Sequence, residues 1–358
     1  MIQIAKPVIG RKEIKAVNRV LRSGSLAQGP EVALFEKEFS SFVGDRNCVA
    51  VNSGTSALHV SLLALGIGLG DEVIVPSFTF AATANSVALT GATAVFVDID
   101  RATYCLDPSL VEKSITPRTR AIQVVHLYGL PANMTEICKI AKRHGLLVIE
   151  DAAQAHLASI QDNKVGTFGD AAAFSFYPTK NMTSGEGGMA VFKSDDAART
   201  ARLLRNQGME TRYQNEIVGF NLRMTDIHAA IGRVQLQKVE EWTEKRIQNA
   251  SYLSKAVDAS MAPTVPQGYR HVYHQYTLRI SSDRPKFISY LTELNIGCSV
   301  YYPTPVHQLK PFSSTLSLPE TVSACQEVVS IPVHPSLTKK ELVRITTALQ
   351  GWQKMLTK

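Results

Sequence analysis

The sequence has no long apolar run and no paired cysteine motif. Its cysteines are Cys48, Cys105, Cys138, Cys298 and Cys325. This odd, scattered set without a CxxC pair argues against a disulfide framework and a zinc site, and it indicates a reducing compartment. The longest apolar run, residues 62–70, is about half of a membrane span, and the N-terminus lacks the apolar stretch of a signal peptide. We therefore expect a soluble, cytoplasmic protein with no metal and no membrane partner.

Acidic residues are fewer than basic ones, which gives a formal net charge of +7. The basic residues are spread along the chain, and the sequence has no Lys/Arg-rich run and no zinc-finger or RNP-type motif. We therefore expect no nucleic-acid partner. The chain has 358 residues with 45% hydrophobic and 19% charged residues, a normal globular composition with room for two domains.

Short apolar strands alternate with helical segments after an N-terminal helical region. Two amphipathic helices are expected around the polar turn at residues 23–30, the second over residues 31–43. Strands are expected at 48–51, 72–75, 94–97, 121–125 and 146–149, and helices between them at 57–65, 77–89 and 134–144. This order predicts an α/β fold with a doubly wound, mostly parallel sheet. Ligands of such sheets gather beyond the carboxyl ends of the strands.

The C-terminal third has a different pattern. A long helix is expected from Thr225 or Asp226 to about residue 246, bridging to a smaller domain. Beyond it we expect strands at 274–280 and 298–302 and helices at 285–294 and 339–355. We therefore predict a large domain over residues 1–245, which includes the N-terminal helices, and a smaller C-terminal α+β domain over residues 246–358.

Two segments at predicted strand ends carry small and polar residues. The sequence Asn-Ser-Gly-Thr-Ser at 52–56 could bring a helix N-terminus to a phosphate, or Ser53 or Thr55 could simply cap the helix. Asp151 follows an apolar strand, and the small residues after it leave room for a planar ligand. A helix cap by Asp151 is the alternative.

The strongest chemical signal is Lys180. It lies in the apolar segment FSFYPTKN, which is followed by the glycine-rich SGEGGMAV. Desolvation lowers the pKa of a lysine and makes its amine nucleophilic, as Schiff-base chemistry requires. The alternative is an ordinary surface lysine in a polar loop.

These segments resemble the DegT/DnrJ/StrS family of sugar aminotransferases. The resemblance rests on EDAAQAH, SFYPTKN, SGEGGMAV, FNLRMTDIHAAIG, NSGTSALH, DEVIVPSFTFAATANS, HLYGLPA and YYPTPVH, in family order from about residue 5 to 350. It implies the fold-type I, aspartate-aminotransferase-like fold, the cofactor pyridoxal 5'-phosphate (PLP), and a homodimer with shared active sites.

The resemblance also implies a role for individual residues. Lys180 matches the Schiff-base lysine, which also moves the proton between substrate and cofactor. Asp151 matches the carboxylate that pairs with the pyridinium nitrogen, and Gln154 matches the residue that contacts the phenolic oxygen. Phe80 matches the aromatic residue stacked on the ring.

The phosphate site implied by the resemblance consists of Gly54, Thr55 and Ser175, with Asn221 reaching it from the partner subunit. Leu157 departs from the family, which commonly has glycine after AQAH, and this leaves the nearby wall of the site in doubt. A branch of the family has histidine in place of the lysine and performs dehydration, and Lys180 argues against that branch.

By the same resemblance, the substrate is a 3- or 4-keto (deoxy)sugar on a nucleoside diphosphate, and the amino donor is glutamate or glutamine. Tyr302 and His307 lie in a segment that the family uses near the sugar, although the tyrosines could instead pack at a domain seam. Arg223 suits a carboxylate or phosphate, or could pair with Asp226.

Two other functions stay open. One is a same-family aminotransferase or dehydratase acting on an inosose or an aminobenzoate precursor. The other is a non-catalytic regulatory or binding protein, against which the intact set Lys180, Asp151 and Gln154 argues.

Overall fold

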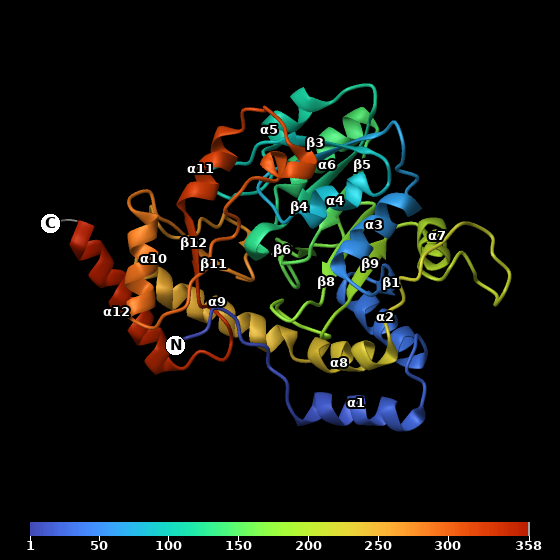
Figure 1. Ribbon diagram of the computed structural model, residues 1–358, viewed down its shortest axis with the longest axis horizontal. Helices are drawn as coiled ribbons and strands as arrows, with labels where there is room; N and C mark the ends of the chain where they lie inside the picture. The colour runs from blue at the N-terminus through green and yellow to red at the C-terminus, as the bar shows by residue number, and fades with distance from the viewer. Residues whose placement is uncertain (357–358) are drawn as a thin grey trace.

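The computed structural model describes residues 1–356, and a seven-stranded sheet forms its centre (Figure 1). In spatial order its strands are β1 (Asn47–Val51), β9 (Gly188–Phe192), β8 (Ala171–Ser175), β5 (Leu147–Asp151), β4 (Thr119–Val125), β2 (Glu72–Pro76) and β3 (Thr93–Val97). Only β9 runs antiparallel to its neighbours. The predicted α/β fold with a mostly parallel sheet is confirmed.

Helices cover both faces of this sheet. Alternate strand residues pack on α3 (Gly54–Ala64), α4 (Ala82–Ala88) and α7 (Asp195–Arg205) on one face. The opposite set packs on α2 (Pro30–Phe42) and α6 (Met134–His144). The strands are buried on both sides, which is why they read as continuous apolar runs.

Shorter elements complete this part of the chain. They are α5 (Pro108–Val111), η1 (Glu112–Ser114), η2 (Leu127–Gly129), and the small sheet of β10 (Tyr269–Arg270), β6 (Ser159–Ile160) and β7 (Asn163–Lys164). Among residues 1–356, no helix is both long and apolar enough to cross a membrane.

The C-terminal part has its own hydrophobic core. It packs around an antiparallel pair of strands, β11 (Tyr276–Arg279) and β12 (Val328–Ile331). Its other elements are α10 (Arg284–Glu293), η3 (Val306–Gln308), η4 (Lys310–Phe312), α11 (Pro319–Glu327) and α12 (Lys339–Leu356). The boundary predicted after residue 245 falls within α9 (Val239–Ser254), which runs between the two parts in Figure 1. The division into two domains therefore stays a prediction.

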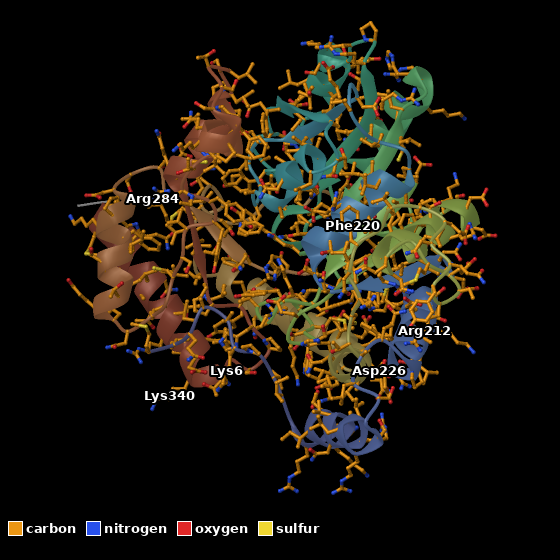
Figure 2. All side chains as sticks on the ribbon, turned by 45° about the vertical axis from the view of Figure 1, so that its right-hand side comes forward. Lys6, Arg212, Phe220, Asp226, Arg284 and Lys340 are labelled. Atoms are coloured by element: carbon orange, nitrogen blue, oxygen red, sulfur yellow. The ribbon has the colours of Figure 1, made fainter. Side chains whose placement is uncertain are left out.

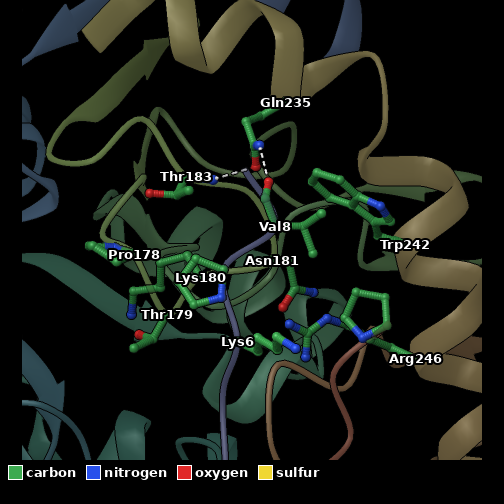
Figure 3. Close-up of a pocket in the computed structure, with 12 residues that line it drawn as sticks. Lys6, Val8, Pro178, Thr179, Lys180, Asn181, Thr183, Gln235, Trp242 and Arg246 are labelled. Atoms are coloured by element: carbon green, nitrogen blue, oxygen red, sulfur yellow. Dashed lines mark hydrogen bonds between the residues drawn. The ribbon is translucent and has the colours of Figure 1, made fainter. Parts of the chain in front are cut away.

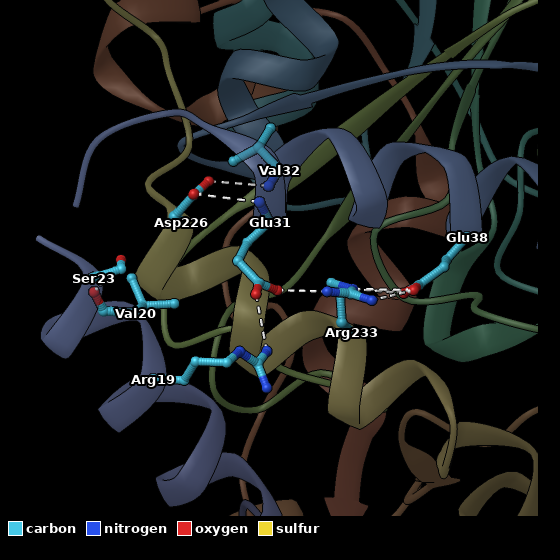
Figure 4. Close-up of polar contacts among 8 residues, drawn as sticks. All are labelled: Arg19, Val20, Ser23, Glu31, Val32, Glu38, Asp226 and Arg233. Atoms are coloured by element: carbon cyan, nitrogen blue, oxygen red, sulfur yellow. Dashed lines mark hydrogen bonds and ion pairs between the residues drawn. The ribbon is translucent and has the colours of Figure 1, made fainter. Parts of the chain in front are cut away.

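The N-terminal helix α1 (Arg11–Ser23) packs along α8 (Asp226–Leu236), as Figure 1 shows. Buried Asp226 accepts hydrogen bonds from the backbone N–H groups of Gly29 (2.8 Å) and Val32 (3.0 Å) and so caps the start of α2. Arg233 of α8 pairs with Glu31 (2.6 Å) and Glu38 (2.6 Å) of α2 (Figure 4). These contacts fix the segment that leads into α8.

Three predicted elements were wrong in extent. The long helix from 226 to 246 is two helices, broken at Gln237 and Lys238. Glu13 of α1 holds this junction, because it accepts hydrogen bonds from the side chains of Gln235 and Lys238. The periodicity of apolar residues in a sequence gives no information about such tertiary contacts.

The other two errors lie near the site. Residues 298–302 form no strand but a single bridge from Ser299 to Ser330, because the prolines at 303 and 305 that follow cannot donate ladder hydrogen bonds. The helix expected at 77–89 is only α4, because Ser77 continues the sheet by donating its N–H to Val97 O (3.2 Å).

Candidate active site

A cavity of about 440 Å³ lies at the carboxyl ends of the parallel strands, where the topology predicts a ligand site. The residues around it come from the turns after β1, β2, β5 and β8 and from the C-terminal part. They are Ser53, Gly54, Thr55, Leu58, Thr79, Phe80, Ala82, Val125, Asp151, Ala153, Gln154, Ser175, Tyr177, Thr179, Lys180, Glu186, His274, Gln275, Tyr301 and Tyr302.

Asp151 is the last residue of β5 and is 6% exposed. Its carboxylate accepts hydrogen bonds from Thr83 Oγ1 (2.9 Å) and from the backbone N–H of Ala153 (3.2 Å). Burial raises the pKa of Asp151 above its usual value, while these hydrogen bonds and the nearby charge of Lys180 act to lower it. The carboxylate therefore has two fixed donors and one cation facing it.

Lys180 lies in the loop between β8 and β9, where its backbone N–H bonds to Tyr177 O (2.9 Å). Desolvation lowers the pKa of its amine to about 8, and only the charge of Asp151 opposes this shift. About a tenth of the amine is therefore uncharged at pH 7, far more than for a solvated lysine with its usual pKa. This environment is that of a nucleophilic lysine rather than of a solvated surface lysine.

His156 is fully buried behind Lys180. Its ring packs against Phe174 (5.3 Å) and Phe176 (5.7 Å), and neither ring nitrogen has a hydrogen-bond partner among the described residues. Burial and then the charge of Lys180 lower its pKa to about 3, so the ring is neutral. His156 therefore contributes packing and no charge.

Gln154 is held at both ends of its amide. Its Oε1 accepts a hydrogen bond from the Tyr128 backbone N–H (2.7 Å), and its Nε2 donates to Tyr302 Oη (3.1 Å). Tyr128 in turn donates its hydroxyl to the carbonyl of Tyr301. This chain of bonds positions the segment around Tyr302 against the cavity.

Helix α3 begins at Gly54, with Ser53 as its cap accepting from Ser56 N (3.1 Å). Both interpretations of residues 52–56 can therefore hold, since Ser53 caps the helix whose first residues, Gly54 and Thr55, line the cavity. A Cβ on Gly54 would lie 2.7 Å from the Ser175 Cβ, so only glycine allows this approach. The helix N-terminus and the Ser175 hydroxyl thus meet at one side of the cavity.

The aromatic wall is formed by Phe80 and Tyr302, whose ring centroids are 5.9 Å apart at 37°. Phe80 is 59% exposed although it lies between buried strand ends. A large apolar ring facing an open cavity suits stacking on a planar ligand.

Four residues singled out in the sequence do not line this cavity. His307 is buried and bonds through Nδ1 to Ser77 Oγ (2.6 Å). Arg223 donates to Asn206 Oδ1 (2.9 Å), whereas Asp226 binds backbone N–H groups, so the suggested Arg223–Asp226 pair is wrong. Asn221 is exposed and forms an isolated bridge with Asn206, directly after Phe220, which Figure 2 labels.

Leu157 is buried in the apolar cluster below the site and does not line the cavity. Its φ of 69° is in the left-handed region, which glycine adopts without strain and a leucine does not. The departure from the family at this position therefore concerns the backbone and not the wall of the cavity.

Sequence reasoning missed several residues of the site, and three of them have side chains that can act chemically. Thr83 bonds to Asp151, while Glu186 and His274 line the cavity. Glu186 lies inside the glycine-rich motif after Lys180. The sequence marks this motif as unusual but indicates no role for its glutamate. Thr83 lies one helical turn after Phe80, and its role depends on a contact with a strand 68 residues away.

Comparisons with known proteins agree with this geometry. The model of the DegT/DnrJ/EryC1/StrS aminotransferase family matches residues 7–350. A dTDP-3-amino-3,4,6-trideoxy-alpha-D-glucose transaminase from Streptomyces venezuelae is 40% identical over 345 residues, covering 94% of this chain and 91% of the relative.

Two solved structures are similar over nearly the whole chain. S. venezuelae DesV, in complex with a ketimine intermediate, has a TM-score of 0.92 at 39% identity. The match covers 95% of this chain and 94% of the DesV chain. Bacillus subtilis NtdA, with the bound cofactor PMP, has a TM-score of 0.89 at 31% identity. The match covers 97% of this chain and 83% of the NtdA chain. The chain therefore belongs to the DegT/DnrJ/EryC1/StrS family and is a PLP-dependent aminotransferase.

Proposed function

We propose that this enzyme transfers the amino group of glutamate or glutamine to a 3- or 4-keto (deoxy)sugar carried on a nucleoside diphosphate. The observation that carries the proposal is the placement of Lys180 and Asp151 on one cavity that also has an aromatic wall and a helix N-terminus. The nucleotide-linked substrate of the S. venezuelae transaminase supports the substrate class.

The residues of the cavity fit PLP. Gly54, Thr55 and Ser175 would hold its phosphate at the start of α3, where N–H groups and the helix dipole favour an anion. Phe80 would stack on the ring, and Asp151 would pair with its pyridinium nitrogen. When bound, PLP supplies an electron sink for the carbon that gains or loses the amino group.

Lys180 and Asp151 would have complementary tasks. The Lys180 amine is poised near neutrality by desolvation, so it can take up a proton at Nζ and return it. Asp151 is kept as an oriented carboxylate by Thr83 and Ala153, and its negative charge would hold a proton on the ring nitrogen. Both groups sit in a partly desolvated site where such charge interactions are strong.

The mouth of the cavity suits a sugar. The carboxylate of Glu186 and the hydroxyl of Tyr302 line it, and both can bond to sugar hydroxyls. Among the described residues that line it, Lys180 is the only Lys or Arg, while Asp151 and Glu186 are acidic. A nucleoside diphosphate therefore needs cationic donors from outside this lining.

A second copy of the chain would supply those donors. We propose a homodimer in which Asn221, with Arg223 nearby, reaches the partner's cavity. Mixing Lys180→Ala and Asn221→Ala proteins tests this, because a shared site restores about a quarter of wild-type activity in the mixture through heterodimers with one intact site. No recovery after verified subunit exchange would contradict the shared site.

The substrate test is a panel assay of the purified enzyme with PLP and labelled glutamate or glutamine. It should compare 3-keto and 4-keto nucleotide sugars with an inosose and an aminobenzoate precursor. The expected result is label transfer to a nucleotide sugar. Transfer only to the cyclic ketone would favour the inosose alternative, and PLP binding without turnover on any ketone would favour the regulatory one.

A further inference from the structure

A second, much smaller cavity lies on the other side of the Lys180 loop (Figure 3). It is formed by the N-terminal segment, the Lys180 loop, helices α8 and α9, and a proline from the C-terminal part. Its lining residues are Lys6, Pro7, Val8, Pro178, Thr179, Lys180, Asn181, Thr183, Gln235, Trp242, Arg246 and Pro335. Lys180 thus lies between this cavity and the larger one.

The lining of the small cavity is cationic and contains no acid. Lys6 and Arg246 contribute two positive side chains, and Asp and Glu are absent from the described residues that line it. Figure 3 shows the side chains of Lys6 and Arg246 pointing toward one another beside Asn181. The two positive charges repel each other, and although Glu341 acts electrostatically on Lys6, no described carboxylate acts on Arg246.

Arg246 is the unusual member of this set. It is 6% exposed, and no ion pair joins it to any described carboxylate within 4.0 Å. Its Nη1 donates only to the carbonyls of Tyr273 (3.2 Å) and His274 (3.4 Å), and its Nε has no partner among the described residues. Burial lowers its pKa to about 10, and no charged neighbour opposes this shift.

A buried guanidinium without a counter-charge is strongly unfavourable, so buried charges in proteins are paired. Arginine stays protonated even when its pKa falls by this much, so the charge itself is present at neutral pH. We propose that the small cavity binds a single small monovalent anion of the chloride type, between Arg246 and Lys6. The anion would complete the hydrogen bonds of Arg246 and separate the two cations.

The size of the cavity selects this class of ligand. Its volume is about 20 Å³, and a single water needs about 10–15 Å³ on the same measure. A space of this size suits a single-atom anion better than tetrahedral sulfate or phosphate, which has four oxygens around a central atom. Exposed Lys6 lies at the rim, so an anion can enter from solvent.

Binding would act on Lys180 through charge. The charged and titratable groups near Lys180 are Asp151 in the large cavity, the neutral rings of His156 and His274, and the cations Lys6 and Arg246 on the small cavity. A negative charge added on the opposite side favours the protonated amine, so the pKa of Lys180 would move upward from about 8. In the presence of halide, the pH at which the Lys180 amine becomes reactive would therefore be higher.

Thermal unfolding of the purified protein tests the proposal in sodium bromide, chloride, sulfate and gluconate at equal ionic strength. A ligand that binds only the folded state raises the unfolding midpoint, here by an expected 2–4 °C, about the shift that one tight site gives. We expect this gain in bromide and chloride for wild type and for Lys286→Gln, an exposed lysine far from the cavity. Arg246→Met should lose the halide-specific gain.

Equal halide responses in wild type and Arg246→Met, or an equal effect of gluconate, would overturn the proposal. If Arg246→Met does not fold, Lys6→Gln provides the second variant, and it should weaken the halide gain. Anomalous diffraction from crystals grown in bromide gives a direct readout, with a peak expected beside Arg246. Density for a carboxylate of a partner subunit at that point would overturn the proposal, because the counter-charge of Arg246 would then come from a second copy of the chain.

The coupling to Lys180 has a separate readout. The rate at which apoprotein forms its Schiff base with added PLP should be measured against pH in bromide and in gluconate. The midpoint is expected to lie at higher pH in bromide for wild type and at the same pH in both salts for Arg246→Met. A midpoint independent of the salt in wild type would show that the anion site does not act on Lys180.

Discussion

Thr83 Oγ1 donates a 2.9 Å hydrogen bond to Asp151 Oδ2, which links helix α4 to the carboxyl end of β5 inside the protein. Both residues are buried, and the backbone N–H of Ala153 bonds to the other carboxylate oxygen. The carboxylate is thereby oriented from two sides before any ligand arrives. This arrangement makes Thr83 a positioning residue for Asp151.

Removal of this hydroxyl by Thr83→Val should move the acid limb of the pH–rate profile upward by about one unit. The carboxylate must be ionised to act, so activity is lost as pH falls through its pKa. Burial raises that pKa and the Thr83 bond lowers it, so loss of the bond raises it further. A charge-assisted hydrogen bond of about 1.5 kcal/mol corresponds to roughly one unit.

Thr90→Val is the matched control, because the Thr90 hydroxyl bonds only to local backbone groups, the carbonyl of Val87 and the N–H of Ala92. Its pH profile should equal that of wild type. A Thr83→Val profile with an unchanged acid limb and merely lower stability would reduce Thr83 to a structural residue.

Gly54→Ala should weaken PLP binding and lower the free energy of unfolding by about 1–3 kcal/mol, the usual cost of overpacking. The added Cβ would lie 2.7 Å from the Ser175 Cβ, so the start of α3 must move away from Ser175. Denaturant titration and PLP titration measure the two effects. Gly68→Ala, with its nearest atom at 3.8 Å, should change neither, and a similar loss in both variants would contradict the account.

Tyr302→Phe should raise the KM for the keto sugar about fivefold and leave the KM for the amino donor unchanged, since one neutral hydrogen bond is worth about 1 kcal/mol. Tyr302 lines the cavity, and its hydroxyl is held by Gln154. Tyr290→Phe, on α10 outside the cavity, is the control. If both KM values are unchanged in Tyr302→Phe, the hydroxyl of Tyr302 does not bind the sugar and the residue only packs against its neighbours.

His307→Gln should lower the free energy of unfolding by about 1–3 kcal/mol, the cost of disturbing a buried hydrogen bond, without a change in either KM. His307 lies outside the cavity and bonds to Ser77. Thermal denaturation and steady-state kinetics are the measurements. A large rise in the KM for the sugar at unchanged stability would return His307 to the substrate site.

The strands and the position of Lys180 could be predicted because their signals are local. Apolar runs such as residues 121–125 identify buried strands, and the glycine-rich turn after Lys180 contains Gly188, which approaches the backbone of Ser53 closely. The break between α8 and α9 had no such signal, since it depends on Glu13 from the other end of the chain.

The same limit applies to the site. Gly54, Asp151 and Lys180 were found because each lies in a distinct motif, whereas Thr83 has no motif and acts through a side-chain contact. Arg246 in particular could not be distinguished in the sequence from other helical arginines. Its lack of a counter-charge emerges only from the packing around it.

The most direct test of Lys180 as the Schiff-base residue is the absorption spectrum of the purified protein with PLP, before and after addition of glutamate, with Lys180→Ala measured beside it. We expect a visible Schiff-base band in wild type that glutamate converts to the amine form, and no such lysine-dependent band in Lys180→Ala. Mass spectrometry after borohydride reduction should place the cofactor on the Lys180 peptide. An identical spectrum and wild-type turnover in Lys180→Ala, or no band in wild type after incubation with PLP, would contradict the assignment.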